Sequence, residues 1–505
     1  MLLDAVPFQD TIGLAAQLIR RAMPAMVLIP LGAAMLSPIL AARSPRAARF
    51  FGGGALLLNF FLSLLVSNLV WWQGPIHYHF GGWAPPIGIE YSVDAVGAMM
   101  APLVAFFALL SFASASRLEK EWTPSHGGAF QALYLLLSAG LMGIVVTGDL
   151  FNLYVFLEIS SLSTYALVAA GGDRAKVAAF RYLIIGSVAA TFWVFGLGYL
   201  YALTGTLNMA DMAERLPAVI GSRAAVAGLA FIVAGLAIKM ALFPLHGWQP
   251  DAYTYAPPGA MPFISAIMAK VSAYALFRVL YDVFLKAGPA GEALELLGWV
   301  AALSILAGSV LALGQRDIRR MLAYSSVAQI GYVLLGFSIG NAFAVTGALL
   351  HMVNHAVMKS CCFAALGAFR AKTGRADVDG VAGLAKEMPW TAAAFTIAAL
   401  GIIGIPPLCG FFSKYYLIRG AVQASAWPFV AVFGVSSVLG TVYFFRIIES
   451  LYLRSADQGA KREIAPLSVI APALLLAGLV LALGVFSQDV VGNFVPIIVS
   501  AGGPS

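Results

Sequence analysis

Charged side chains inside apolar stretches are the first feature that could do chemistry. Glu158 has no Lys or Arg within four positions, and Lys239 stands in a similar apolar run five residues before Pro244. Such groups cost about 2.5–3.5 kcal/mol each at mid-membrane on insertion scales, so they usually serve a function. Their opposite charges and similar expected depth predict a pair. The pair could carry or modulate protons, or be a structural salt bridge; Lys239 could also extend its amine to the interface.

Two more lysines and one histidine extend this pattern. Lys270 lies within an apolar run, and Lys414 follows the break at residues 404–413, at the expected outer end of its span. A lysine removed from water can take part in proton exchange. His246 comes seven residues after Lys239, two turns along the same face of a continuous helix. It could relay protons to the cytoplasm, or simply pack at the interface.

A polar stripe marks one later segment. His351, His355 and Lys359 are spaced i, i+4 and i+8, and Asn354 flanks them. Three titratable groups on one helix face predict a proton wire with water between them, the alternative being a structural stripe. A metal site would need further ligands that the sequence does not show, so we expect none.

The elements that position these residues are membrane helices. Hydrophobic residues make up 61% of the 505 residues and charged residues 10%, where a soluble protein has roughly 25% charged residues. This balance excludes a soluble enzyme, a disordered chain and a disulfide scaffold. A membrane helix needs about 20 apolar residues, and the runs are too long and too continuous for barrel strands. The sequence therefore predicts an all-α polytopic membrane protein with about 14 transmembrane helices.

Two blocks of similar length suggest an internal repeat. Residues 129–283 and 294–449 each hold five predicted spans, so the second block would enter the membrane from the opposite side. Residues 1–128 and 450–505 flank these inverted repeats. Each block has one span broken by proline, at Pro244 and at Pro406 and Pro407. Proline removes a backbone hydrogen bond, which lipid tolerates only beside protein or a polar cavity, so we expect hinges there.

Loop charges predict the orientation. With the N-terminus outside, the inner loops hold 17 Lys and Arg residues and the outer segments 6, which places both termini on the outer side of the cell membrane. Residues 2–19 are amphipathic and could lie in the interface, and no ordinary cleaved signal is evident. The cysteines lack metal spacing, and no nucleotide, zinc-protease or hydrolase motif occurs in a credible context. We expect no cofactor and no nucleic-acid partner.

In combination these segments resemble a known family over about residues 90–450. The segments are Thr147–Glu158, Lys239 with Pro244 and His246, Asp317–Ser326, His351–His355, and Gly404–Pro407 with Lys414. They resemble the antiporter-like subunits, which include large subunits of Mrp cation/proton antiporters and proton-pumping membrane subunits of complex I and membrane-bound hydrogenases. Within the family, Thr147–Glu158 and Ala202–Met209 look closest to the D-type subunit of the Mrp antiporters.

The resemblance implies a role for each residue. Glu158 would pair with Lys239, Lys270 would stand mid-axis, and Lys414 would lie near the exit. His351 and His355, with Lys359 nearby, would connect the two halves. The function implied is proton translocation in a multisubunit Na⁺ or K⁺/proton antiporter, by a transporter subunit rather than an enzyme. The alternatives are a proton-pumping subunit of a complex I-like or hydrogenase redox complex, and a structural or independent module such as a scaffold or a single-chain carrier. The implied partners are small hydrophobic subunits and a second antiporter-like subunit.

Overall fold

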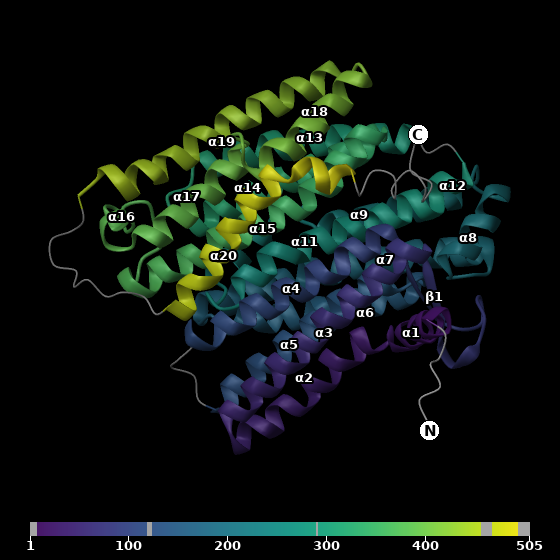
Figure 1. Cartoon of the computed structure of the whole chain (residues 1–505). Helices are drawn as coiled ribbons and strands as arrows, with labels where there is room; N and C mark the ends of the chain where they lie inside the picture. Colours follow the sequence, from purple (N-terminus) through teal and green to yellow (C-terminus); the bar gives the residue numbers. More distant parts are fainter. Residues whose placement is uncertain (1–7, 119–123, 289–290, 456–466, 493–505) are drawn as a thin grey trace.

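The computed structural model describes residues 8–118, 124–288, 291–455 and 467–492. Long helices run alongside one another through the molecule (Figure 1), as lipid demands of a backbone that must satisfy its own hydrogen bonds. The first half contains α1 (Phe8–Ala22), α2 (Ala25–Arg43), α3 (Pro45–Gln73), α4 (Ala95–Leu118), α5 (Pro124–Val146), α6 (Leu150–Ala169), α7 (Asp173–Thr204), α8 (Met209–Arg215), η2 (Leu216–Ala218), α9 (Arg223–Lys239), α10 (Gln249–Tyr255), α11 (Met261–Phe277), η3 (Arg278–Phe284) and α12 (Leu285–Ala287). The second half contains α13 (Gly291–Leu313), α14 (Ile318–Ile339), α15 (Ala342–Thr373), α16 (Leu384–Glu387), α17 (Pro389–Ile403), α18 (Cys409–Gln423), α19 (Trp427–Leu453) and α20 (Leu467–Val485).

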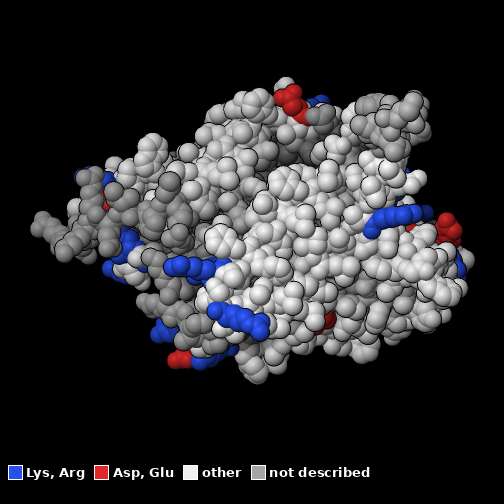
Figure 2. Space-filling view, turned by 60° about the horizontal axis from the view of Figure 1, so that its bottom comes forward, with Lys and Arg blue, Asp and Glu red and all other residues white. Residues whose placement is uncertain are grey.

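Eleven helical segments of the described chain are long and apolar enough to cross a membrane. Two shorter apolar helices, Pro389–Ile403 and Val469–Val485, accompany them. Figure 2 shows a largely uncharged face, with most of its Lys and Arg side chains on the left and a smaller charged group at the right. The expectation of a helical multi-pass membrane protein is confirmed. The count of 14 spans, the inverted repeats and the division at residues 128, 283 and 449 stay predictions.

Both expected proline breaks are present. Helix α9 ends at Lys239 and α10 begins at Gln249, so Pro244 lies in the turns between them. Helix α17 ends at Ile403 and α18 begins at Cys409, with Pro406 and Pro407 in the gap. Side chains add hydrogen bonds at both breaks. Lys414 donates to the Ile403 oxygen at 3.0 Å, and Trp248 donates at 2.9 Å to the Ile238 oxygen, which also accepts from the Ala241 backbone at 3.1 Å.

One element was not expected from the sequence. The strands β1 (Ile76–His79) and β2 (Glu90–Val93) pair antiparallel, with Ile76 opposite Val93 and the short helix η1 (Phe80–Gly82) between them. The expectation of a purely helical chain is therefore wrong in this loop. A period-2 signal over four residues is too short to recognise beside long apolar helices.

The core is built around α11 and α15, which pack against each other near the middle of the bundle (Figure 1). Every residue of α11 is buried, as is most of α15. These two helices carry Lys270, His351, His355 and Lys359. These four ionisable residues thus face protein rather than lipid, as intramembrane ionisable groups almost always do.

Candidate functional site

The predicted pair of Glu158 and Lys239 forms across two helices. Lys239 Nζ, on the last residue of α9, donates to Glu158 Oε1 on α6 at 2.8 Å and to Ser161 Oγ at 2.7 Å. The Lys239 side chain is 6% exposed and that of Glu158 25% exposed. The pair therefore has one member enclosed by protein and one that reaches a more open region. Ser161 lies one turn after Glu158 on the same helix face and supplies a second partner for the amine.

Lys270 is enclosed in the middle of α11. It is fully buried, and its amine donates to the Ser265 carbonyl oxygen at 2.7 Å. Among the described residues it has no carboxylate within salt-bridge distance. Lys359 and His355, both on α15, interact with it electrostatically. Lys270 thus links the first half of the site to the polar stripe on α15.

The α15 stripe lies on one continuous buried helix, as the spacing predicted. The rings of His351 and His355 are 5.9 Å apart and nearly parallel. His351 Nδ1 is hydrogen-bonded to Ser413 Oγ and Nε2 to Gln329 Oε1, both at 2.9 Å. His355 is fully buried, and neither ring nitrogen has a hydrogen-bond partner within the described chain. An unpartnered buried imidazole is costly unless water or a moving proton serves it.

The other end of the stripe is anchored by α14. Lys359 Nζ donates to the Leu322 carbonyl oxygen at 2.9 Å and to Ser325 Oγ at 3.1 Å. Lys359 itself is fully buried. Hydroxyl and carbonyl oxygens can hold its amine in place without supplying a full counter-charge. The lysine therefore keeps a fixed position while remaining able to respond to charges that move elsewhere on the axis.

Lys414 stands beside the second helix break. Its amine donates to the Ile403 carbonyl at the end of α17, lies 3.5 Å from Ser437 Oγ, and sits 4.9 Å from the centre of the Tyr332 ring. Gly404, with φ +96°, brings the backbone close to the lysine stem. The expectation that Lys414 marks the outer end of its span is wrong, because α18 continues to Gln423. The break leaves Lys414 near the start of the second half-helix.

His246 is not positioned as the sequence suggested. Helix α9 stops at Lys239, so His246 lies in a turn and does not share a helix face with that lysine. The histidine is partly buried, its ring centre is 5.9 Å from that of Tyr324 on α14, and its Nδ1 has no hydrogen-bond partner among the described residues. The relay role for His246 stays a prediction, now through the turn rather than along a helix.

Of four buried lysines in the site, only Lys239 has a carboxylate partner among the described residues. Lys239, Lys270, Lys359 and Lys414 are all buried, and Glu158 is the acidic group that pairs with one of them. Lys414 also acts electrostatically on His351. An unpaired charge in this setting costs several kcal/mol. When one residue gains or loses a proton, the protonation state that is stable at a neighbouring residue therefore changes. This arrangement can pass a charge change from one residue to the next.

Several partners in the site gave no usable signal in the sequence. Gln329 and Ser413 hold His351 from α14 and α18, and Ser325 holds Lys359. Each lies 22 to 62 residues away along the chain from the group it contacts. Ser161 alone could have been found, from its i, i+3 spacing with Glu158. Within the described chain no group of three or more His, Cys, Asp or Glu side chains could hold a metal ion.

A second polar cluster lies outside the spanning helices. His77 Nδ1 is 2.6 Å from Glu90 Oε1, and Asn208 donates to Glu90 Oε2 at 2.6 Å. Burial would raise the pKa of Glu90, but the hydrogen bonds from His77 and Asn208 outweigh it and leave the pKa below its usual value. The β-hairpin is thereby attached to the loop after α7. Asp149 caps α6 by accepting from the Asn152 amide at 2.7 Å.

Comparison with known proteins decides the family. Residues 147–440 match the family described as NADH:quinone oxidoreductase/Mrp antiporter, transmembrane. The chain belongs to this family. It is 49% identical over 484 residues to NADH-quinone oxidoreductase subunit N of Desulforudis audaxviator, covering 93% of this chain and 97% of the relative. It is 31% identical over 467 residues to the D-type subunit of the Na(+)/H(+) antiporter of Alkalihalophilus pseudofirmus, covering 90% and 91%.

A solved structure is similar along nearly the whole chain. A chain of the membrane-bound sulfane sulfur reductase, an archaeal respiratory membrane complex, superposes with a TM-score of 0.88 at 31% identity. The match covers 96% of this chain and 98% of the other. The sequence-based family assignment is confirmed. This protein is a multi-pass membrane member of the NADH:quinone oxidoreductase/Mrp antiporter family, whose relatives are transporter or complex subunits.

Proposed function

We propose that this chain is the proton-translocating membrane subunit of a multisubunit complex. The observation that carries the proposal is the 2.8 Å pair between Glu158 and Lys239, set beside buried lysines that have no carboxylate of their own within the described chain. A passive scaffold gains nothing from several unpaired intramembrane cations, each of which costs free energy.

The path we propose follows the geometry from one half of the bundle to the other. Protons would reach Lys239 by way of His246 and pass to Lys270. His355 and Lys359 would take the charge change across to α15, and His351 would connect it to Lys414. When Glu158 holds Lys239, the lysine stays charged; when the pair opens, proton release from Lys239 becomes favourable. The gaps around Pro244 and around Pro406 and Pro407 would act as hinges that let these side chains move.

Two driving forces fit this machinery. Redox coupling is supported by the 49% identity to a subunit of an NADH-quinone oxidoreductase and by the structural likeness to a respiratory complex. Exchange of Na⁺ or K⁺ for protons is supported by the 31% identity, over 90% of this chain, to the D-type subunit of a Na(+)/H(+) antiporter. In both cases the chain works with other membrane subunits, small hydrophobic ones and a second antiporter-like subunit.

The test uses inverted membrane vesicles that contain the chain with its co-expressed subunits. A pH gradient dissipated by added Na⁺ or K⁺, and not in the Lys239→Ala variant, supports the antiporter. A pH gradient formed on adding a reductant such as NADH, and lost in the same variant, supports the redox pump. If Lys239→Ala assembles normally and neither response differs from the native complex, the proposed function is wrong.

A further inference from the structure

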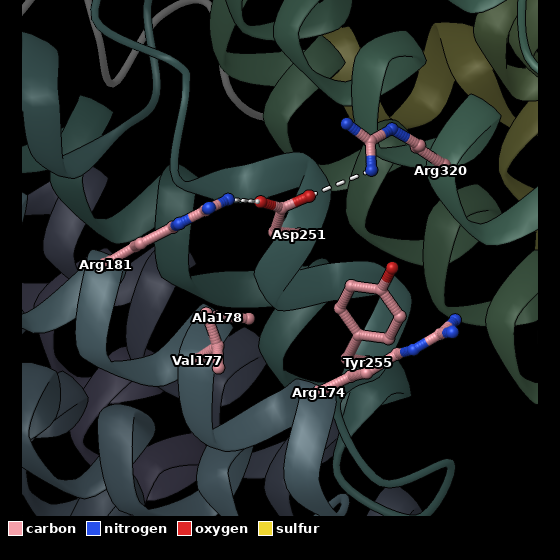
Figure 3. Close-up of a pocket in the computed structure, with 7 residues that line it drawn as sticks. All are labelled: Arg174, Val177, Ala178, Arg181, Asp251, Tyr255 and Arg320. Atoms are coloured by element: carbon pink, nitrogen blue, oxygen red, sulfur yellow. Dashed lines mark hydrogen bonds and ion pairs between the residues drawn. The ribbon is translucent and has the colours of Figure 1, made fainter.

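A basic pocket that includes none of the proposed proton-carrying residues lies where α7, α10 and α14 meet (Figure 3). It has a volume of about 390 Å³ and is lined by three arginines, Arg174, Arg181 and Arg320, but a single carboxylate, Asp251. Arg181 donates to one Asp251 oxygen at 3.0 Å and Arg320 to the other at 2.9 Å. The carboxylate thus has both oxygens occupied, and the pocket keeps an excess of positive charge.

Arg174 adds a positive charge that no carboxylate pairs with in the part of the chain the structure describes. It is exposed and makes no ion pair with any residue the structure describes. The exposed acidic neighbour Asp173 is paired with Lys176 at 3.0 Å. In Figure 3 the Tyr255 hydroxyl points toward the same space as the Arg320 guanidinium, so a neutral donor lies beside the cations. Arginines with an added hydroxyl are the donors that bind a phosphate group.

The position of Arg174 and Arg181 near the start of α7 indicates that the phosphate belongs to a lipid. Helix α7 has 32 residues, about 48 Å of helix, while the hydrocarbon core is about 30 Å thick. Its first turns carry Arg174, Lys176 and Arg181, so we place this end of the helix at the level of the lipid headgroups. Arg174 and Arg181 are seven residues apart and share one face of the helix.

The same face continues as an apolar stripe. Val177, which lines the pocket, is 55% exposed, and Ile184 and Val188 further along α7 are 51% and 44% exposed. These residues fall at i+3, i+10 and i+14 from Arg174 on one side of the helix: Val177 lies between the two arginines, and Ile184 and Val188 follow Arg181. Cationic headgroup partners at the interface and an exposed apolar stripe beneath them match the two parts of a phospholipid.

We propose that this pocket binds an anionic phospholipid. Its phosphate would lie between Arg174 and Arg320, beside the Tyr255 hydroxyl, and one acyl chain would lie along Val177, Ile184 and Val188. This assignment is independent of whether the complex exchanges cations or is driven by redox chemistry.

The experiment is native mass spectrometry of the detergent-solubilised complex with phosphatidylglycerol or phosphatidylcholine. We expect phosphatidylglycerol to be retained preferentially, and Arg174→Gln to lower its retention about five-fold, the effect of one surface arginine on anionic lipid. Arg174→Lys, which keeps the charge, should retain most of the binding. Arg46→Gln is the matched control, because Arg46 is an exposed arginine that the chain connectivity places at the same end of the bundle, outside the pocket.

Four results would overturn the proposal. Equal losses in Arg174→Gln and Arg46→Gln would show only a general surface charge effect, and equal retention of phosphatidylcholine would show no headgroup selection. Binding of inorganic phosphate to the pocket without retention of the lipid would identify a soluble anion instead. Lipid bound only after the other subunits are stripped would mean that a protein covers the pocket. Unchanged melting temperatures of the variants confirm that they are folded.

Discussion

Replacing Glu158 with Gln tests the central pair most directly. The change keeps the size of the side chain and one hydrogen-bond acceptor but removes the negative charge. At 2.8 Å, and with an effective dielectric constant of about 20, the attraction between Lys239 and Glu158 is about 6 kcal/mol before desolvation is counted. Removing one partner of a buried pair typically costs about 3–5 kcal/mol.

The expected loss lies near the lower end of that range. Glu158 is one-quarter exposed, at 25%, and Ser161 still accepts a hydrogen bond from Lys239 at 2.7 Å. A change of about 3 kcal/mol shifts the equilibrium between protonated and deprotonated Lys239 by a factor of about 100. We therefore expect Glu158→Gln to melt at a lower temperature and to translocate protons about 10 to 100 times more slowly.

A double variant separates stability from transport. In Glu158→Gln with Lys239→Met no unpaired charge remains, so stability should return to within about 1 kcal/mol of the native protein. Transport should stay lost, because the group that carries the proton is gone. Thermal unfolding in detergent gives the first quantity, and quenching of a pH-sensitive dye in inverted vesicles gives the second.

The matched control is an ion pair between an aspartate and an arginine outside the proposed proton path. Asp211 accepts from Arg215 at 2.8 Å one helical turn away, with the arginine 44% exposed. Asp211→Asn makes the same change in charge, but an exposed pair of this kind contributes only about 0–1 kcal/mol, and proton transport should be unaffected. The reasoning is refuted if folded Glu158→Gln transports at the native rate, or if the double variant regains transport.

Four further variants, each at a single position, give predictions. His355→Leu removes a buried imidazole with no hydrogen-bond partner in the described chain, so the melting temperature should be unchanged or slightly raised while proton transport falls at least about ten-fold. His351→Leu loses two hydrogen bonds, so it should lower transport and also lower the free energy of unfolding by about 1–3 kcal/mol. Gly404→Ala places a Cβ 3.0 Å from the Lys414 stem at a φ of +96°, so both thermal stability, by about 1–2 kcal/mol, and vesicle transport should fall. The pKa of Glu90 in the folded protein lies below its usual value of about 4.3. The ionised carboxylate therefore contributes its full stability above that pH, and this stability is lost as the pH falls through the folded pKa. The difference in melting temperature between the native protein and Glu90→Gln should shrink toward zero in acid, and a constant difference would contradict the assignment.

Much of the site could be found from residue type and burial alone. The apolar setting of Glu158, Lys239, Lys270 and Lys414 marks them because lipid makes every intramembrane charge expensive. The stripe of His351, His355 and Lys359 follows from helical spacing, and the structure confirms that one continuous helix carries all three. The sequence was least informative where the helix stops: His246 seemed to share a face with Lys239, but α9 ends at that lysine.

The sequence by itself determined that lipid surrounds most of the chain and that its main secondary-structure elements are helices. Long apolar runs can satisfy their backbone in lipid only as helices, and proline fixes where two of them break. The tertiary structure decided the partners. It placed Ser413 and Gln329 on either side of His351 and set Lys239 against Glu158. It also gathered the arginines of α7 and α14 around Asp251, far from either in sequence. Such contacts depend on which helices pack together. The periodicity of a single helix shows which of its faces is buried, but not which helix packs against that face.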